Sequence, residues 1–446
     1  PADIRKEGSA YDLTIAIGIL IASEQIKGVN KVEDYYIMGE LSLDGTLQPI
    51  RGALSVAIEA KKRGKRGLIL PAQNAREAAI VADIEVLGVH NIKEVIDFFN
   101  EEKEIERITI NTREEFQRSL NNYEFDFSDV KGQENIKRAL EIAAGGGHNV
   151  ILIGPPGSGK TMLAKRLPSI LPPLTLHEAL ETTRIHSVAG KMSRYASLIS
   201  IRPFRSPHHT ISDVALVGGG SNPQPGEISL AHNGVLFLDE LPEFKRTVLE
   251  VMRQPLEDRF VTIARSKYSV DFPASFMFIA AMNPCPCGNY NHPKIPCTCG
   301  QGLVQKYLNK VSGPLMDRID IHVEVVPVTH EELASTKPVE KSEEIRKRVI
   351  KARAIQNKRF AEYERIHCNA QMSRKQVEQY CPISTEGEKL LKTAMERLGL
   401  SARAYDRILK VARTIADLEE SPEIEIEHLS EAINFRSLDR DNWGRR

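Results

Sequence analysis

The sequence predicts an α/β protein with a parallel-sheet core, a helical region after the core and a smaller α+β domain before it. Three segments dense in apolar residues, "NVILIG", "GVLFLDE" and "SFMFIAAMN", are separated by helical stretches. This pattern is typical of a parallel sheet that is buried on both faces. After about Pro327 the apolar residues follow a helical spacing only, and before residue 98 short β-like runs alternate with helical ones.

The whole chain sets limits on its class. Its 446 residues with a formal net charge of zero favour two or three domains, and any attraction to nucleic acid must come from local patches. No apolar run reaches the length of a membrane span, so we expect no membrane partner. Six cysteines, four of them clustered, favour metal ligation in a reducing cytoplasm over a disulfide scaffold.

The first predicted domain covers residues 1–98 and is followed by a linker at 99–125. "DYYIMGELSL" predicts a strand, "GALSVAIEAKKRG" an amphipathic helix, and "GLIL" a second strand that ends at Pro71. The linker is rich in charged residues and Asn. Because the chain begins at Pro1 and not at Met, we expect this domain to be shortened at its N-terminus.

The core, residues 126–328, begins with a candidate phosphate loop, "GPPGSGKT", directly after the strand "NVILI". Glycines let backbone N–H groups turn toward phosphates, helped by the positive end of the following helix. Lys160 is expected to reach the β- and γ-phosphates of ATP, and the Thr161 hydroxyl to hold Mg²⁺. The alternative is a simple Gly/Pro turn. The predicted nucleotide-binding residues of the loop are Gly154, Pro155, Pro156, Gly157, Ser158, Gly159, Lys160 and Thr161.

Two further strands end in polar residues that fit the same site. Asp239 is a candidate Mg²⁺ ligand, and Glu240 can polarise the attacking water. Asn283, at the end of the third strand, can orient that water. Taken alone, an acidic pair often marks a helix N-terminus and an Asn-Pro pair a turn. Together, the three strands predict hydrolysis of a nucleoside triphosphate.

Four cysteines follow Asn283 with the spacing C-x-C-x₉-C-x-C, namely Cys285, Cys287, Cys297 and Cys299. Four thiolates match a closed tetrahedral Zn²⁺ site. The intervening "GNYNHPKIP" has little to pack, so a metal would have to order it and fix the loop mechanically. The alternatives are free thiols, disulfides formed on oxidation, or His292 in place of one ligand.

A basic stretch in the core is a candidate DNA contact. Between Glu181 and Asp213 there is no carboxylate, and aromatic residues are interleaved with the basic ones. The hairpin-like "RFVTIARSKYSVDFPASF" is a second candidate. The alternative is a solvated or subunit-contacting loop. The predicted DNA-binding residues are Arg202, Arg205, His208 and His209, with Arg265 and Lys267 near the hairpin tip.

The combined motifs resemble the magnesium-chelatase-like branch of the AAA+ ATPases, the ComM/YifB family. The resemblance is carried by "GQENIKRALEIAAGGGHNVILIGPPGSGKT", "PFRSPHHT" and "MNPCPCG…SGPLMDRID", and it covers essentially the whole chain. It implies an AAA+ P-loop core, a C-terminal helical lid at residues 329–446, and hexameric rings with ATP bound between subunits. It also implies that Arg318 is an arginine finger acting on the neighbouring subunit, that Arg403 is the second sensor, and that Gln133 seats the adenine.

The first domain is similar to the Lon protease domain in "KEGSAYDLTIAIGIL" and "GELSLDGTLQPIRGALSVAIEAKKRG". That likeness puts Ala10 at the position of the Ser nucleophile and Leu54 at the position of the Lys base. Without a nucleophile and a base in contact, acyl transfer has no route. Ser9 lies one residue away, and we interpret it as a helix cap. We therefore predict a Lon-like fold without peptidase activity.

The family resemblance implies a cytoplasmic ATP-driven motor that acts on single-stranded or branched DNA, such as a branch-migration helicase in natural transformation, with recombination proteins as possible partners. A rival hypothesis is a chelatase-like ATPase that remodels proteins. A third is a nucleotide-gated scaffold, which the presence of Glu240 and Asn283 argues against.

Overall fold

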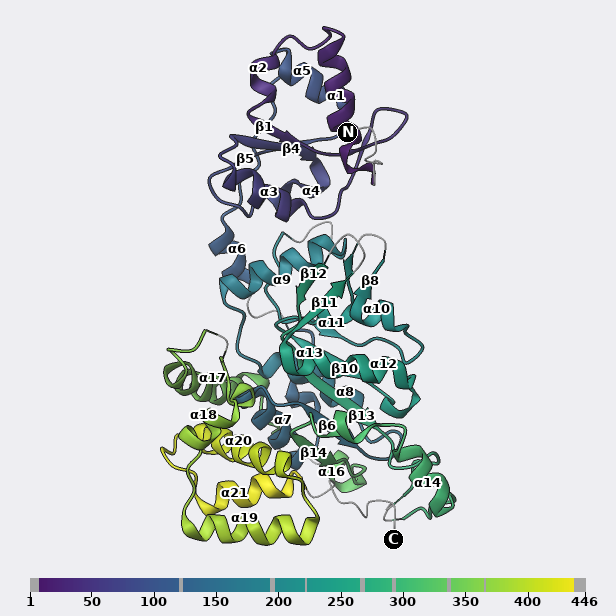
Figure 1. The fold of residues 1–446 in the computed structure, drawn as a ribbon, viewed down its shortest axis with the longest axis vertical. Coiled ribbons are helices and arrows are strands. Elements are labelled where there is room, and N and C mark those ends of the chain that lie inside the picture. Colours follow the sequence, from purple (N-terminus) through teal and green to yellow (C-terminus); the bar gives the residue numbers. More distant parts are fainter. Residues whose placement is uncertain are drawn as a thin grey trace. The chain divides into compact units, whose positions relative to one another are not determined.

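The computed structural model describes residues 8–119, 123–192, 197–220, 223–264, 269–290, 294–334, 338–364 and 366–436. The chain forms two compact units. Residues 1–121 and 174–201 form unit 1, and residues 122–173 and 202–446 form unit 2 (Figure 1). Residues 174–201, which lie inside the predicted core in the sequence, thus belong to the unit that contains the N-terminal domain. The predicted domain boundaries remain a prediction.

A three-stranded parallel sheet is the centre of unit 1, in the order β1–β4–β5. The predicted strand "DYYIMGELSL" is divided at Gly39 into β1 and β2, which belong to different sheets. The predicted linker contains a helix, α6. The elements are η1 (Ser9–Tyr11), α1 (Asp12–Ala22), α2 (Val29–Val32), β1 (Tyr35–Ile37), β2 (Glu40–Leu41), β3 (Leu47–Gln48), α3 (Ala53–Lys62), β4 (Gly67–Pro71), α4 (Ala72–Ala78), β5 (Glu85–Val89), α5 (Ile92–Phe99), α6 (Thr112–Ser119) and α9 (Leu176–Val188).

Helices cover both faces of this sheet. Side chains of a strand alternate between its two faces. Ile69 and Leu87 therefore pack toward α1 and α5, while Leu68 and Val86 pack toward α3 and α4 (Figure 1). Helix α9 packs on α3, and the Gly52 N–H donates a 3.1 Å hydrogen bond to the Ser187 carbonyl.

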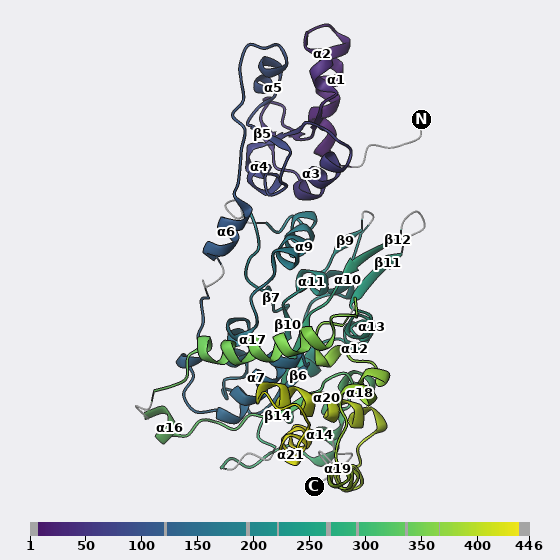
Figure 2. The same ribbon diagram turned by 90° about the vertical axis from the view of Figure 1, so that its left-hand side faces the viewer.

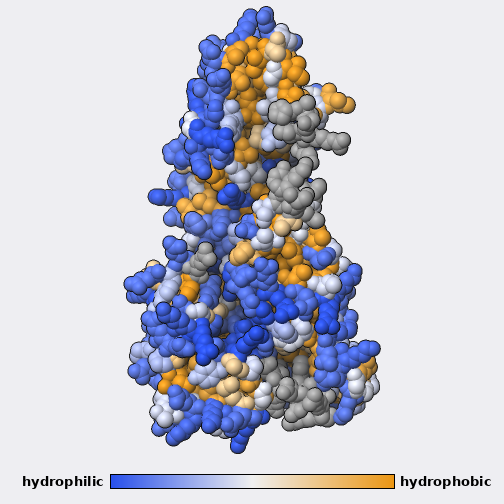
Figure 3. All heavy atoms as spheres, in the orientation of Figure 1, coloured by the Kyte–Doolittle hydropathy of each residue, from blue (hydrophilic) through white to orange (hydrophobic). Residues whose placement is uncertain are grey.

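An apolar stripe that stays exposed runs from the last residue of η1 into helix α1. Tyr11, Ile15 and Ile19 follow one another at four-residue intervals and are 53%, 47% and 63% exposed. Residues four apart lie on the same helix face. Figure 3 shows hydrophobic surface in this part of unit 1.

A five-stranded parallel sheet is the centre of unit 2, in the order β14–β6–β13–β10–β7. Its strands are β6 (Val150–Ile153), β7 (Phe204–Arg205), β10 (Val235–Leu238), β13 (Met277–Met282) and β14 (Ile321–Glu324). The three predicted strands are β6, β10 and β13, and this confirms the predicted α/β class. In a parallel sheet all carboxyl ends lie at one edge. The polar residues after β6, β10 and β13 therefore lie together.

The rest of the core surrounds this sheet. Val150 and Leu152 pack toward α7, α8 and the lid, whereas Ile151 and Ile153 pack toward α11, α12 and α13. The other core elements are η2 (Phe127–Asp129), α7 (Glu134–Gly146), α8 (Lys160–Ile170), α10 (Asp213–Val217), β8 (Gly218–Gly219), β9 (Gln224–Pro225), α11 (Glu227–Leu230), η3 (Leu241–Glu243), α12 (Arg246–Val251), α13 (Arg253–Asp258), β11 (Phe260–Ala264), β12 (Ser269–Pro273), α14 (Gln301–Leu308), α15 (Gly313–Met316) and α16 (His330–Ala334).

The C-terminal lid is helical, as predicted. It consists of α17 (Ser342–Arg359), η4 (Asn369–Gln371), α18 (Arg374–Tyr380), α19 (Thr385–Leu398), α20 (Ala402–Leu418) and α21 (Ile426–Asn434). Figure 2 shows the long α17 beside α7, on which it packs. In α17 the apolar residues Ile345, Val349 and Ala352 recur at helical spacing and are buried. Within the described residues, no helix is both long and apolar enough to cross a membrane.

A buried charge network connects the lid helix α20 with the sheet. Arg407 of α20 forms an ion pair with Asp320, just before β14. His148 lies 3.3 Å from the same carboxylate and 2.8 Å from the Thr414 hydroxyl. Burial alone would raise the pKa of Asp320, but Arg407 and His148 hold that pKa well below its ordinary value of 3.8. The carboxylate therefore stabilises the folded unit.

Replacing Asp320 with Asn is expected to lower the free energy of unfolding by about 3 kcal/mol, because it leaves the Arg407 charge poorly compensated. A depressed folded-state pKa means that the contribution is complete above 3.8 and is lost as the pH falls below it. Urea denaturation should thus give the same difference in the free energy of unfolding between the wild-type and Asp320→Asn proteins at about pH 5 and pH 8. Asp317→Asn is the control, since its partner Arg403 is 68% exposed. Asp317→Asn should lower the free energy of unfolding by less than about 1 kcal/mol. Equal losses of stability in the two variants would contradict the prediction.

Candidate nucleotide and metal sites

The phosphate loop lies between β6 and α8, where its glycines meet distinct requirements. A Cβ at Gly154 would lie 2.3 Å from the Val325 carbonyl oxygen, so no side chain fits there. Gly157 and Gly159 have φ angles of +75° and +88°, which other residues rarely adopt. The first N–H groups of α8 have no partner within the helix and are available to an anion.

The Lys160 side chain lies across this loop. Its ammonium group donates 2.8 Å hydrogen bonds to the carbonyls of Gly154 and Pro155, and lies 3.3 Å from Asn283 Oδ1. The side chain is only 8% exposed, and burial lowers its pKa, while Asp239 and Glu240 act in the opposite direction. The lysine is therefore anchored at the place where phosphates would lie.

The acidic end of β10 meets the loop directly. The Thr161 hydroxyl donates a 2.6 Å hydrogen bond to Asp239 Oδ2. A hydroxyl and a carboxylate at this separation are oxygen ligands of the kind that Mg²⁺ takes in phosphoryl-transfer sites. The residues present therefore fit Mg²⁺, which Thr161 and Asp239 would hold and which would supply positive charge beside the phosphates.

Glu240 takes an unusual backbone conformation and contacts a residue for which we predicted another role. Its φ and ψ are +53° and +47°, the left-handed region. His209 Nδ1 lies 3.4 Å from Glu240 Oε2, and the His209 ring also contacts the His208 ring, with 4.0 Å between centroids and an angle of 34° between the ring planes. The residue predicted to bind DNA thus lies against the predicted catalytic carboxylate. Sequence reasoning missed this pair, because β7, which precedes His209, is only two residues long.

The three residues implied by the family resemblance lie elsewhere in unit 2. The Gln133 amide donates a 2.7 Å hydrogen bond to the Val326 carbonyl, next to the Val325 that contacts Gly154. Arg318 pairs with Glu257 at 2.5 Å, and its side chain is 12% exposed. Arg403 pairs with Asp317 at 3.0 Å. Gln133 therefore lies near the phosphate loop, while both arginines are engaged with acidic residues, and all three roles remain predictions.

The predicted DNA-binding arginines also have partners in the fold. Arg202 donates to the carbonyls of Pro172 and Asn233 at 2.6 and 2.7 Å. Arg205 forms a two-point ion pair with Glu227 at 2.6 and 2.7 Å. His208 is exposed. Arg265 and Lys267 lie outside the described residues. The strands that precede and follow them in the sequence, β11 and β12, form an antiparallel pair (Figure 2). These DNA contacts remain a prediction.

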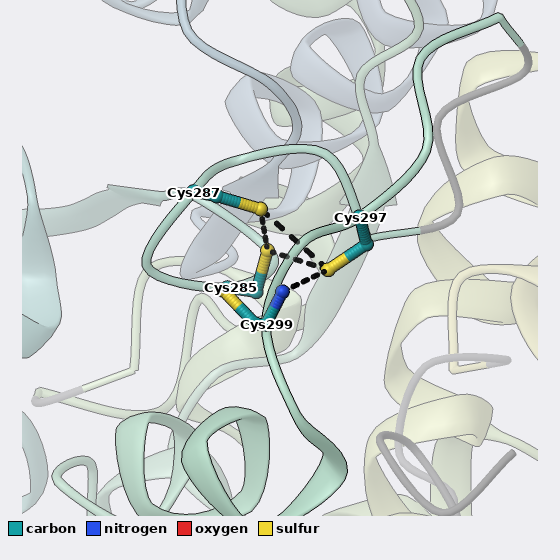
Figure 4. A group of neighbouring side chains, drawn as sticks. All are labelled: Cys285, Cys287, Cys297 and Cys299. Carbon is teal, nitrogen blue, oxygen red and sulfur yellow. Dashed lines mark hydrogen bonds between the residues drawn. The ribbon is translucent and has the colours of Figure 1, made fainter.

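The four clustered cysteines converge on one point (Figure 4). The sulfur atoms of Cys285, Cys287 and Cys297 lie 3.4 to 3.7 Å apart, and all four sulfurs, including that of Cys299, lie within 4.8 Å of one another. With Zn–S bonds of about 2.3 Å, a tetrahedral site requires sulfur separations of about 3.8 Å. The donor set and its spacing therefore fit Zn²⁺. His292 lies outside the described residues.

The Lon-like positions in unit 1 hold no catalytic pair. Ala10 lies in η1, and Leu54 is 1% exposed in α3, where its N–H donates a 2.9 Å hydrogen bond to Glu77. The Ser9 hydroxyl donates to Glu40. Neither Ala10 nor Leu54 has a titratable side chain, so acyl transfer has no nucleophile or base at these two positions.

Comparison with known proteins identifies the family. The family description "Magnesium chelatase, subunit ChlI" matches residues 126–333, its C-terminal counterpart matches 339–436, and "Subunit ChlI of Mg-chelatase" matches 1–74. The chain is 42% identical over 441 residues to "Competence protein ComM" of Haemophilus influenzae, covering 99% of this chain and 85% of that protein. The chain belongs to the magnesium-chelatase-like ComM/YifB family of AAA+ ATPases.

A second relative supports the ComM/YifB assignment, and a third shows a likeness to a Lon protease. "Uncharacterized protein YifB" of Escherichia coli is 44% identical over 441 residues, covering 99% of this chain and 84% of that protein. "Lon protease 2" of Bacillus subtilis is 30% identical over 230 residues, covering 44% of this chain and 40% of that protein. Family membership identifies the protein as an ATPase and suggests ATP and Mg²⁺ as its ligands.

Proposed function

We propose that this ATPase is a ring-forming motor that acts on DNA, as a translocase or branch-migration helicase. The observation that supports ATP hydrolysis most strongly is the meeting of Lys160, Thr161, Asp239 and Asn283 at the carboxyl edge of one parallel sheet. Support for DNA comes from the acid-free basic stretch, from the hairpin with Arg265 and Lys267, and from the competence name of a relative that is 42% identical.

Each residue of the site has a distinct task in this proposal. Lys160 and the loop amides bind the β- and γ-phosphates, and Thr161 and Asp239 hold Mg²⁺, which neutralises charge on the nucleotide when bound. Glu240 polarises the attacking water, and Asn283 orients it. Arg318 of a neighbouring subunit stabilises charge that develops on the transferred phosphoryl group.

Two further assignments belong to this proposal. The four thiolates hold a structural Zn²⁺, for which their spacing is suited. The Lon-like domain has no peptidase activity, because alanine and leucine stand at the nucleophile and base positions. Elemental analysis of protein purified without chelator should give about one zinc per chain, which is what a single closed site requires.

DNA should stimulate ATP turnover. The test measures the ATPase rate with single-stranded, duplex and forked DNA. The Lys160→Ala protein gives the background rate of phosphate release. Because contacts to several phosphates release counterions, DNA affinity should fall by orders of magnitude between about 50 and 200 mM salt. The double variant Arg265→Ala/Lys267→Ala should lower the ratio of stimulated to basal rate, with Lys62→Ala, on the exposed face of α3, as its matched control.

An equal rate with all three DNAs and without DNA would reject the DNA motor. That result would favour a chelatase-like motor that remodels a protein, the alternative that the match to the magnesium chelatase subunit supports.

A further inference from the structure

The cysteine cluster touches the phosphate loop through a glycine. Gly288 follows Cys287, has a φ of +79°, and donates a 3.0 Å backbone hydrogen bond to the Cys285 carbonyl. A Cβ at Gly288 would lie 2.4 Å from Pro156 Cδ and 2.9 Å from Pro156 Cγ. The turn that carries two of the four thiolates therefore lies directly on the proline ring in the middle of the phosphate loop.

The same segment contacts the loop at two more points. The Met282 carbonyl accepts a 3.2 Å hydrogen bond from the Gly154 N–H, at the beginning of the loop. Asn283 Oδ1 lies 3.3 Å from the Lys160 ammonium group, at its end. Residues 282–288 thus touch the beginning, middle and end of the phosphate loop, and the same segment contains Cys285 and Cys287.

The segment has few other means of holding its shape. Cys285 is fully buried and its sulfur accepts a 3.3 Å hydrogen bond from the Tyr290 N–H, but Cys287, Cys297 and Cys299 are only partly buried. Turn residues dominate between the two Cys-x-Cys pairs. In such a segment, metal binding and local folding are one event.

We propose that Zn²⁺ on these four thiolates supports the phosphate loop, so that binding of zinc and binding of Mg·ATP are coupled through the Gly288–Pro156 contact. The proposal rests on the zinc site and the nucleotide site of the proposed function, and it adds the coupling between them. Zinc fixes the turn, the turn fixes Pro156 and Asn283, and these hold the loop and Lys160 in the shape that binds phosphates.

Coupling between two sites is reciprocal and has a typical size of about 5- to 150-fold in affinity. Removal of zinc should therefore weaken Mg·ATP binding by a factor in this range. Mg·ATP should in turn raise the equilibrium affinity for zinc by the same factor.

The first experiment measures both directions on the full chain. Equilibrium titration with a fluorescent ATP analogue and Mg²⁺ gives nucleotide affinity for zinc-loaded, zinc-stripped and Cys287→Ser protein, with zinc content measured on each sample. Titration with a zinc chelator, with and without the analogue, gives the reverse direction. Cys381→Ala, a buried lid thiol outside the cluster, is the matched control and should keep both affinities.

The second experiment tests the contact itself without removing a ligand. Gly288→Ala retains all four thiolates, and its new methyl group pushes against Pro156; nucleotide affinity should fall at least fivefold. Pro156→Ala removes the ring atoms in question, so the double variant should bind the analogue better than Gly288→Ala alone. Gly64→Ala controls for backbone strain, because Gly64 has a φ of +68° and nothing within 4 Å of its added Cβ.

The outcomes separate four claims: the zinc site, the nucleotide site, the coupling between them and the Gly288–Pro156 contact as its route. Well under one zinc per chain in the wild-type protein rejects the zinc site and this proposal with it. Zinc binding with unchanged nucleotide affinity in the stripped, Cys287→Ser and Gly288→Ala proteins rejects the coupling alone. Failure of the zinc-loaded protein to bind the analogue rejects the nucleotide site. Loss of affinity in Gly288→Ala that Pro156→Ala does not relieve rejects the Gly288–Pro156 contact as the route.

Discussion

Replacing Lys160 with alanine is expected to lower ATP turnover by about 100-fold or more, the cost of removing one preorganised charge from a transition state. The ammonium group is held within the loop by the carbonyls of Gly154 and Pro155 and by Asn283, and it exchanges one of these partners for a phosphate oxygen when ATP binds. Burial lowers the pKa of Lys160, and the Asp239 and Glu240 carboxylates oppose that shift. A bound triphosphate adds negative charge that favours the ammonium form further.

Lys165→Ala is the matched control for Lys160→Ala. It changes the same residue type on the same helix, α8, but at an exposed position. Its ATPase rate should equal that of the wild-type protein, measured as phosphate release at saturating Mg·ATP. A Lys160→Ala protein that retains more than about a tenth of the wild-type rate would contradict a phosphate-binding role for this lysine.

The convergence of the candidate nucleotide-site residues was largely predictable from the sequence for a physical reason. The phosphate loop is local, because a strand, a glycine turn and a helix follow one another directly. Asp239 and Asn283 are distant in sequence, but each ends a buried strand, and parallel strands place their carboxyl ends at one edge. The 2.6 Å contact of Thr161 with Asp239 and the 3.3 Å contact of Lys160 with Asn283 agree with that expectation.

Contacts between loops could not be predicted in the same way. The stretch between Glu181 and Asp213 lacks carboxylates, yet Arg205 forms an ion pair with Glu227, which lies beyond the end of the stretch. Local composition shows which charges are present but not which distant charges meet them. The same applies to His209 and Glu240, and to Gly288 and Pro156, because neither pair follows from strand order or helical spacing.

Replacing Arg318 with alanine is expected to lower the rate of ATP hydrolysis by about 10³-fold while the protein still binds nucleotide. An arginine that arrives from a neighbouring subunit stabilises the transition state only in an assembled ring, so binding of ATP to a single chain does not depend on it. ATPase rate and equilibrium binding of a fluorescent ATP analogue, measured on the same preparation, separate the two steps.

The contacts of Arg318 in the structure support an alternative role, in which this arginine stabilises the fold of its own chain. The Arg318 side chain is 12% exposed, pairs with Glu257 at 2.5 Å and donates to the Pro314 carbonyl, which are the contacts of a structural residue. To act on a neighbour, Arg318 must exchange Glu257 for the phosphoryl group. Glu257 itself is 60% exposed, so water can take its place at small cost. Glu257→Gln should therefore leave hydrolysis intact or raise it.

Mixing two inactive variants distinguishes the roles. In a ring assembled from Lys160→Ala and Arg318→Ala chains, some interfaces join an intact phosphate loop from one chain with an intact Arg318 from the next. If the arginine acts between subunits, the mixture regains ATPase activity that neither variant has alone. If Arg318 acts only within its own chain, no interface is complete and the mixture stays inactive. Restored hydrolysis would thus show that the pairing with Glu257 is exchanged during turnover, whereas an inactive mixture with a lowered melting temperature for Arg318→Ala would assign this arginine to the fold.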